Sequence, residues 1–311
     1  MKYVSYLNHI FKRKINELND FVVFGQNVST GSCLGGLCKD FTTINSCKIF
    51  NTPNTENTLV GMGFGLMMSG VPSALFLKQQ DFLLLGVDQL RNTHNFIRQT
   101  TSLTSFTIVN IVMDAGYEGI QSSLNNLPDF CAISSCQGFT ISSKKEAEFI
   151  IDQSIENPGF KIISISQRLL GTEILEFKDQ FSLPEVFIMQ YRKGSDLTIA
   201  CFNFSLPQGT FICEQLDKLR ISTSLYNITA AHPINYNSIL ADAFITGRLI
   251  IIDDSKSSIS VSTYLENEAL RAGVEIIHLF KRQLTDQSYR PHDEIYNIDI
   301  NLILNKMRLL T

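Results

Sequence analysis

The sequence predicts an α/β protein of two modules, each built on a mostly parallel sheet. Short apolar runs alternate with segments of helical periodicity along most of the chain, and this alternation is typical of parallel sheets covered by helices. The run 106–113 is apolar enough for a strand buried on both faces. Residues 167–195 follow no period, since Gly171, Pro184, Gly194 and scattered charges interrupt them. We therefore expect a linker there.

The predicted elements fill both modules. A helix is expected over residues 1–20, before a module at 21–166 and, after the linker at 167–195, a second module at 196–311. In the first module the apolar runs predict strands at 21–24, 49–50, 73–77, 106–113, 130–133 and 161–165, and helices at 56–70, 82–98 and 144–156. In the second module they predict strands at 197–202, 224–229, 248–253 and 274–280, and helices at 208–219, 236–246, 260–272 and 299–310.

The stretch 50–70 carries the clearest functional signal. Pro53 ends the strand before it, and apolar residues then recur at helical spacing until Gly70. Glu56 therefore falls in the first turn of a helix, where the helix dipole favours a carboxylate. This position is the mouth of a strand–loop–helix unit, which is where α/β proteins bind ligands.

Several motifs around this stretch occur together in one known family. The chain reads Asn-Thr-Pro-x-Thr-Glu at 51–56, Val-Gly-x-Gly-x-Gly at 60–65, Asp-Phe-Leu-Leu-Leu at 81–85 and Asp-Gln-x-x-Asn at 88–92. With these motifs the chain resembles the beta subunits of thiamine-diphosphate-dependent 2-oxo-acid dehydrogenases and, more widely, the pyrimidine-binding half of transketolases. The resemblance runs from about residue 20 to the end, with Asn51 where the family usually has Asp. It implies that 21–166 is a pyrimidine-binding domain and 196–311 a transketolase-type C-terminal domain.

The resemblance also implies roles for single residues. Glu56 would bind the pyrimidine nitrogen of thiamine diphosphate and so favour the tautomer that deprotonates the thiazolium carbon, Phe82 would stack on the pyrimidine ring, and Asn54 would approach it. Each residue has a structural alternative. Glu56 could serve the helix dipole alone, Phe82 could belong to the core, and Asn54 is a common turn residue.

The resemblance further implies a partner chain. The Gly-Asp-Gly motif with a distant Asn, by which the family binds diphosphate through Mg²⁺, does not occur in the sequence. We therefore expect an alpha-type subunit to hold the diphosphate and Mg²⁺, most simply in an alpha2beta2 heterotetramer.

The pattern Gly-x-Gly-x-Gly at 61–65 lies within a helical period, so it does not indicate a dinucleotide loop. Its small residues would instead allow close approach of another helix at a subunit interface.

The segment 114–128 departs from the family. Dehydrogenase beta subunits have a longer loop here with a histidine that serves substrate chemistry, whereas this chain has none, and Gln121 is the nearest polar replacement. We therefore favour transketolase-like ketol transfer or carboligation of a 2-oxo acid or ketose. The alternatives are a pyruvate-type 2-oxo-acid dehydrogenase subunit and a non-catalytic structural subunit. None of the five histidines is expected to be catalytic, and His94 is expected at the surface or at an interface.

Composition excludes other classes of function. The net charge of −4 and the absence of a block of like charges argue against nucleic-acid binding. The longest apolar runs are of strand length, and the amino terminus reads as an amphipathic helix, so a cytoplasmic location without a membrane span is expected. The seven cysteines form no Cys-x-x-Cys pair and predict reduced thiols without a metal site.

Overall fold

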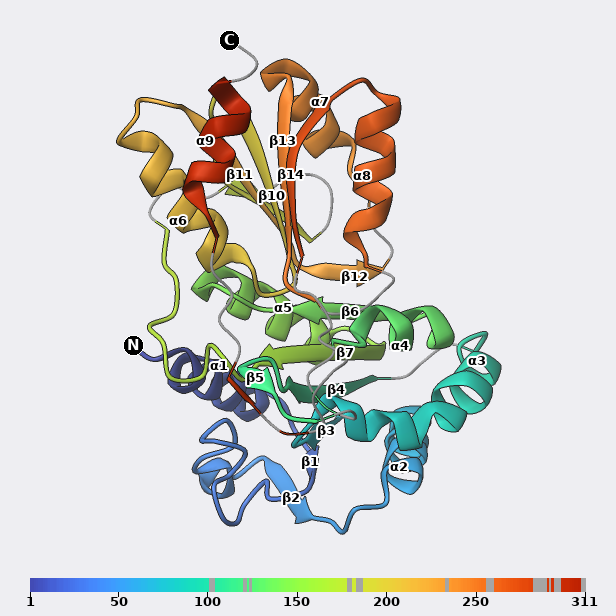
Figure 1. Ribbon diagram of the computed structural model, residues 1–311. Helices are drawn as coiled ribbons and strands as arrows, with labels where there is room; N and C mark the ends of the chain where they lie inside the picture. The colour runs from blue at the N-terminus through green and yellow to red at the C-terminus, as the bar shows by residue number, and fades with distance from the viewer. Residues whose placement is uncertain are drawn as a thin grey trace. The chain divides into compact units, whose positions relative to one another are not determined.

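The computed structural model describes residues 1–100, 104–119, 122, 125–177, 181–182, 187–232, 235–255, 260–281, 290, 292–293 and 298–308. It divides into two compact units. The first consists of Met1–Glu176 and Tyr289–His292, and the second consists of Phe177–Ser288 and Asp293–Thr311. Each unit has its own sheet flanked by helices (Figure 1), so the predicted two-module α/β fold is confirmed. The unit boundary falls inside the segment expected to be a linker, and the predicted limits at 166 and 196 stay predictions.

The first unit is organised around a parallel sheet in the order β6-β7-β4-β3-β1-β2. Its strands are β1 (Phe21–Gly25), β2 (Cys47–Asn51), β3 (Ser73–Leu77), β4 (Ser105–Val112), β6 (Gln137–Thr140) and β7 (Gly159–Ser166). Outside this sheet lies the short strand β5 (Gly116–Tyr117), where Tyr117 stacks on His292 of β15 (His292–Asp293) with ring centroids 5.1 Å apart.

Helices cover both faces of this sheet. The unit contains α1 (Tyr3–Glu17), η1 (Phe41–Thr43), α2 (Glu56–Met68), η2 (Gln80–Gly86), η3 (Gln89–Thr93), α3 (His94–Ile97), α4 (Leu127–Ser134) and α5 (Lys144–Glu156). Successive residues of β4 point to opposite layers: Thr107 Oγ1 donates to the carbonyl of Ser154 in α5 at 2.9 Å, and Phe106 packs edge-on against Phe64 of α2 at 5.3 Å. The alternation shows that α5 and α2 lie on opposite faces, with α1 packed along α5 (Figure 1).

The predicted helix over 82–98 is wrong as a single element. The chain instead forms a 3₁₀ segment in η2, a π-helical turn in η3 and one turn of α-helix in α3. Gly86 is the last residue of η2, and a Cβ there would lie 2.8 Å from Val60 Cγ2 of α2. Because η2 presses so closely on α2, glycine is needed at that point, and glycine also weakens a continuous helix.

The strand predicted at 130–133 is also wrong. These residues lie in α4, which has Pro128 in its first turn, and the strand follows later as β6. Proline is favoured at the start of a helix, and a short apolar run does not by itself distinguish a buried helix from a buried strand.

The second unit repeats the alternation on a sheet in the order β14-β13-β10-β11-β9-β8. The sheet is formed by β8 (Phe181–Ser182), β9 (Ile188–Arg192), β10 (Leu197–Phe202), β11 (Thr223–Ile228), β13 (Arg248–Asp253) and β14 (Glu275–Lys281). The short strand β12 (Ala230–His232) lies outside this sheet, and the helices of the unit are α6 (Leu206–Asp217), α7 (Asn237–Thr246), α8 (Ser262–Arg271) and α9 (Ile300–Arg308). Strand β9 pairs antiparallel with β11. It lies within the segment expected to be a linker.

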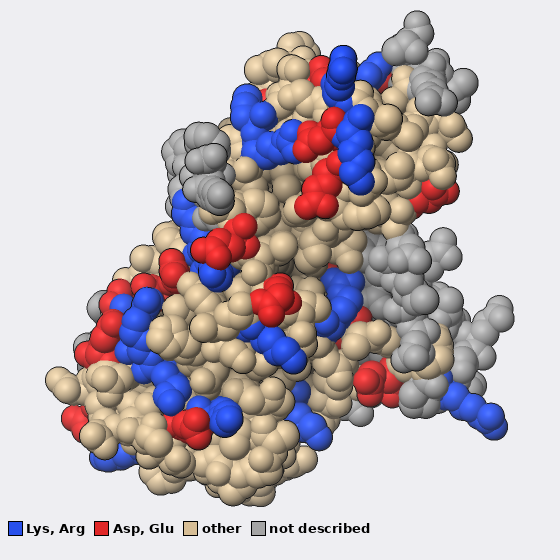
Figure 2. Space-filling view, turned by 90° about the vertical axis from the view of Figure 1, so that its left-hand side faces the viewer, with Lys and Arg blue, Asp and Glu red and all other residues tan. Residues whose placement is uncertain are grey.

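The surface is mixed in charge. On the face shown in Figure 2, lysine and arginine side chains are interspersed with aspartate and glutamate, as the small net charge of −4 leads one to expect. Of the helices in the described ranges, none is long and apolar enough to cross a membrane.

Two glycines of α2 provide a matched test of this packing. A Cβ at Gly63 would lie 2.1 Å from the ring of Phe106, whereas a Cβ at exposed Gly65 would meet nothing within 4 Å. We expect Gly63→Ala to lower the free energy of unfolding by about 1–3 kcal/mol because it overpacks the core. Gly65→Ala should raise it by up to about 1 kcal/mol because alanine favours the helix. Urea unfolding of the two variants measures both changes, and equal effects would contradict the packing described here.

Candidate active site

The candidate site lies at the carboxyl end of β1 and β2, where α2 begins. The two strands are parallel and in register, with Gly25 opposite Asn51 at their ends. After β2 the backbone N–H of Thr52 donates to the carbonyl of Gly25 at 3.0 Å, and Thr55 is the residue before the first turn of α2. Glu56 is the first residue of that helix, as predicted, and so stands at the sheet edge where open α/β folds bind ligands.

Glu56 is a buried carboxyl group with a defined partner. Its side chain is 2% exposed, and Oε1 accepts a hydrogen bond from Gln26 Nε2 at 2.8 Å. Gln26 is itself buried and directly follows β1. Since a buried charge is costly without hydrogen bonds, this contact helps to stabilise the carboxyl group at its buried position.

Gly25 is what allows Gln26 to reach this position. Its φ is +143°, and a Cβ there would lie 2.1 Å from the backbone oxygen of Phe76 in β3. Only glycine can occupy this place, because both the dihedral angle and the contact exclude a side chain. Sequence reasoning assigned Gln26 no role. A polar residue directly after a buried strand, at the edge that also holds Glu56, is the signal that could have identified it.

The other predicted site residues are placed differently. Asn54 is exposed and makes no hydrogen bond among the described residues, while Phe82 is half-buried in η2. Segment η2 packs on α2, since a Cβ at Gly86 would lie 3.6 Å from the backbone oxygen of Glu56. The structure thus brings Glu56 and the segment of Phe82 together. Gln121 lies outside the described residues.

Asp81 is a buried carboxyl group that sequence reasoning did not single out. It is fully buried, and among the residues that the structure describes neither of its carboxylate oxygens has a hydrogen-bond partner. Burial raises the pKa of Asp81 to about 6. Unsatisfied buried carboxylates are uncommon in folded proteins, and this one immediately precedes Phe82.

His94 was expected at the surface or at an interface, but it is instead buried within the first unit. The side chain is 6% exposed, its ring stacks on Phe64 at 5.3 Å, and Nδ1 lies 2.9 Å from the carbonyl oxygen of Ser134. Burial lowers its pKa. Its sequence neighbours are polar, but its own helix face points into the aromatic cluster beneath α2, so His94 serves the core.

Two further features complete the search for sites. All seven cysteines are free, and within the described ranges no group of three or more His, Cys, Asp or Glu could hold a metal ion. A cavity of about 550 Å³ lies in the second unit, lined by Ser195, Asp196, Leu219, Ile221, Thr246, Arg248, Leu304 and Met307. None of the site residues predicted from the sequence lines this cavity.

The unpaired state of Asp81 gives a test by pH. Because the pKa of Asp81 is raised in the folded protein, the folded state binds the Asp81 proton more tightly than the unfolded chain does. Protonation of Asp81 therefore stabilises the fold at low pH, and this stabilisation is lost as the pH rises through about 6. Asp81→Asn should therefore unfold with a free energy higher than wild type by on the order of 1–3 kcal/mol above pH 7, with the gap closing towards pH 4. Urea unfolding across this range measures the gap, and Asp20→Asn, at an exposed position, is the control. A gap independent of pH would contradict the account.

Comparison with known proteins finds relatives of low sequence identity. No protein-family model matches it. The mitochondrial 2-oxoisovalerate dehydrogenase subunit beta 2 of Arabidopsis thaliana is 24% identical over 239 residues, which are 74% of this chain and 65% of that protein. The pyruvate dehydrogenase E1 component subunit beta of a Staphylococcus epidermidis strain is 20% identical over 309 residues, 96% of this chain and 94% of that protein.

The fold agrees with these relatives. A solved split-gene transketolase, described as an inactive beta4 tetramer, superposes with a TM-score of 0.73 at 13% identity and covers 98% of this chain and 96% of its own. The resemblance that rested on the motifs at 51–56, 60–65 and 81–85 is thereby confirmed. In sequence the chain is thus similar to the beta subunits of 2-oxo-acid dehydrogenases, and in fold it is similar to a transketolase beta chain.

Proposed function

We propose that this chain is the beta-type subunit of a heteromeric thiamine-diphosphate enzyme that acts on a carbon–carbon bond next to a carbonyl group. The observation that carries the proposal is the carboxyl group of Glu56. It lies buried at the first turn of α2, at the ligand-binding edge of a parallel sheet.

The side chains at this edge fit the pyrimidine end of the cofactor. In the part of the chain that the structure describes, Gln26 supplies the one hydrogen bond to the Glu56 carboxyl group, and it does so at Oε1. Oε2 is then left to share a proton with a ring nitrogen, in surroundings dry enough to make that hydrogen bond strong. Phe82 would present its half-buried ring to the heterocycle.

Each residue has a limited part in the proposed chemistry. The bound cofactor would supply the nucleophilic carbon that adds to a substrate carbonyl. Glu56 would hold the proton at Oε2, Gln26 would keep the carboxyl group in the orientation that this requires, and Phe82 would exclude water from one face of the ring. Asn54, which is exposed, would contact the cofactor only with its loop ordered around it.

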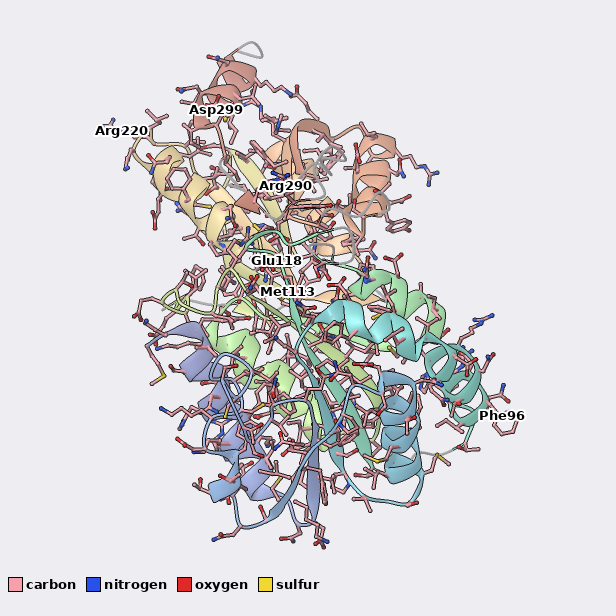
Figure 3. The ribbon with its side chains drawn as sticks, turned by 60° about the horizontal axis from the view of Figure 1, so that its bottom comes forward. Phe96, Met113, Glu118, Arg220, Arg290 and Asp299 are labelled. Atoms are coloured by element: carbon pink, nitrogen blue, oxygen red, sulfur yellow. The ribbon has the colours of Figure 1, made fainter. Side chains whose placement is uncertain are left out.

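We assign the diphosphate and Mg²⁺ to an alpha-type partner in an alpha2beta2 assembly. Two observations support a partner. The relatives at 24% and 20% identity are named as beta subunits, and several large apolar side chains on the helices of the first unit are exposed. The most exposed is Phe96, at 83%, which projects outward from the end of α3 (Figure 3). Exposed apolar surface is typical of sites where partner chains bind.

The reaction within this class is proposed as transketolase-like ketol transfer or carboligation, with a ketose or a 2-oxo acid as substrate. The histidine-free segment 114–128 favours it. A second candidate, the beta subunit of a 2-oxo-acid dehydrogenase, is favoured by the names of the relatives. A non-catalytic subunit is the third candidate, and the burial and pairing of Glu56 argue against it.

Assembly can be tested at α2. If another helix approaches this helix across its small residues, a large side chain at exposed Gly65 should block it, although the position has open space within the chain. We expect Gly65→Leu to abolish association with the co-expressed partner in size-exclusion chromatography with light scattering. Gly171→Leu, at another exposed glycine with open space around it, serves as control. A fully assembled Gly65→Leu complex would show that this face of α2 is not part of the subunit interface.

The cofactor proposal is tested by Glu56→Gln. Thiamine diphosphate with Mg²⁺ is titrated calorimetrically into the chain purified with its partner. Loss of a charged hydrogen bond, worth about 1.5–3 kcal/mol, should weaken binding about 10- to 100-fold. Glu146→Gln is the matched control, since Glu146 is a buried glutamate in the first turn of α5 that serves a capping box. Equal affinity of wild type and Glu56→Gln, with both complexes assembled, would end the proposal.

A further inference from the structure

Gln80 is a buried side chain in η2 whose polar atoms are all hydrogen-bonded. It is the first residue of η2 and is fully buried. Its Nε2 donates to Ser164 Oγ at 2.8 Å and to Asn125 Oδ1 at 3.1 Å, and its Oε1 accepts from the backbone N–H of Asn126 at 2.7 Å. Both amide protons and the amide oxygen are therefore in use.

These bonds join three separate parts of the first unit. Asn125 Oδ1 also accepts from the backbone N–H of Leu127, the first residue of α4, at 3.2 Å. Ser164 in β7 donates in turn to Asn110 in β4 at 2.8 Å, and the two residues are paired in register. Gln80 thus connects η2, the start of α4 and the carboxyl-terminal part of two central strands.

The orientation of the Gln80 amide follows from its partners. A backbone N–H can only donate, so the atom facing Asn126 must be the amide oxygen. The amide nitrogen then faces Ser164 and Asn125, each of which presents an oxygen. An apolar residue would fill the same space, but it would leave the buried N–H of Asn126 unpaired, and such a group is costly.

We propose that Gln80 is a positioning residue that holds η2 and the start of α4 together as one body. Its meaning for catalysis rests on the proposed function, in which η2 carries Phe82 to the cofactor. A ligand that fixes the ring of Phe82 would therefore also fix the position of the first turn of α4. The sequence did not reveal this role, because the three residues that bond to Gln80 lie 45, 46 and 84 positions away.

Hydrogen exchange of the full chain, without cofactor, tests the connection directly. In Gln80→Met, exchange in peptides covering 79–86 and 125–134 should become about 10-fold faster or more, since buried hydrogen bonds are lost at both ends. Peptides of β10 and β11 in the second unit should not change. Gln79→Met is the control, because Gln79 is half-buried and bonds through its side chain to no described residue. Ser164→Ala, a milder second variant, should accelerate the 79–86 peptide and leave the Asn126 bond in place.

A second arm adds thiamine diphosphate and Mg²⁺ to the assembled pair. In wild type, cofactor binding should slow hydrogen exchange in both the 79–86 and the 125–134 peptides. In Gln80→Met, it should slow exchange only in the 79–86 peptide. The KM for substrate should then rise more than the dissociation constant of the cofactor does. Unchanged exchange at 125–134 in Gln80→Met, or an equal acceleration throughout the chain, would overturn the proposal. Absence of cofactor binding in wild type would count against the proposed function alone, because the exchange of the free chain decides the role of Gln80 separately.

Discussion

The close approach of two backbones at Gly25 is the constraint on which the candidate site depends. A Cβ at Gly25 would lie 2.1 Å from the carbonyl oxygen of Phe76, so the end of β1 can pass β3 only without a side chain. That passage leaves Gln26 at the sheet edge, 2.8 Å from Glu56. The pairing of β1 with β2 brings the turn before α2 to the same edge. One glycine thereby sets the partner, the burial and the orientation of the carboxyl group.

Around this edge the protein buries polar groups that cost stability. Asp81 has two unpartnered oxygens within the described structure, and Asn110 has an unpartnered amide nitrogen there. The apolar layer beneath α2 offsets such costs. The rings of Phe64, Phe106 and Phe160 lie about 5 Å apart, and His94 packs against Phe64 and Phe160. Buried polar atoms without hydrogen-bond partners are typical of functional sites, where stability is lower than in the packed core.

The sequence predicted most of the fold because its signals are local. Strands β3 and β7 and helix α5 follow from apolar runs and from the Ser143 cap with Glu146. The errors arose where tertiary contacts override local pattern, as at α4 and at Gly86. Glu56 could be placed from Pro53 and the helical period alone, but Gln26 and Gln80 could not be assigned, since their partners are set by strand order and not by spacing.

On the proposed function, another polypeptide completes the site. The first unit offers a buried carboxyl group at Glu56 and a half-buried ring at Phe82, which suit a flat, uncharged heterocycle. Within the described ranges it offers no cluster of metal ligands, and a diphosphate carries charge that must be neutralised by a cation or by basic side chains. On the proposed function, binding energy is therefore divided between two chains. The cofactor would then join them, and affinity for the cofactor and affinity between the subunits would rise and fall together, as linkage between two binding events requires.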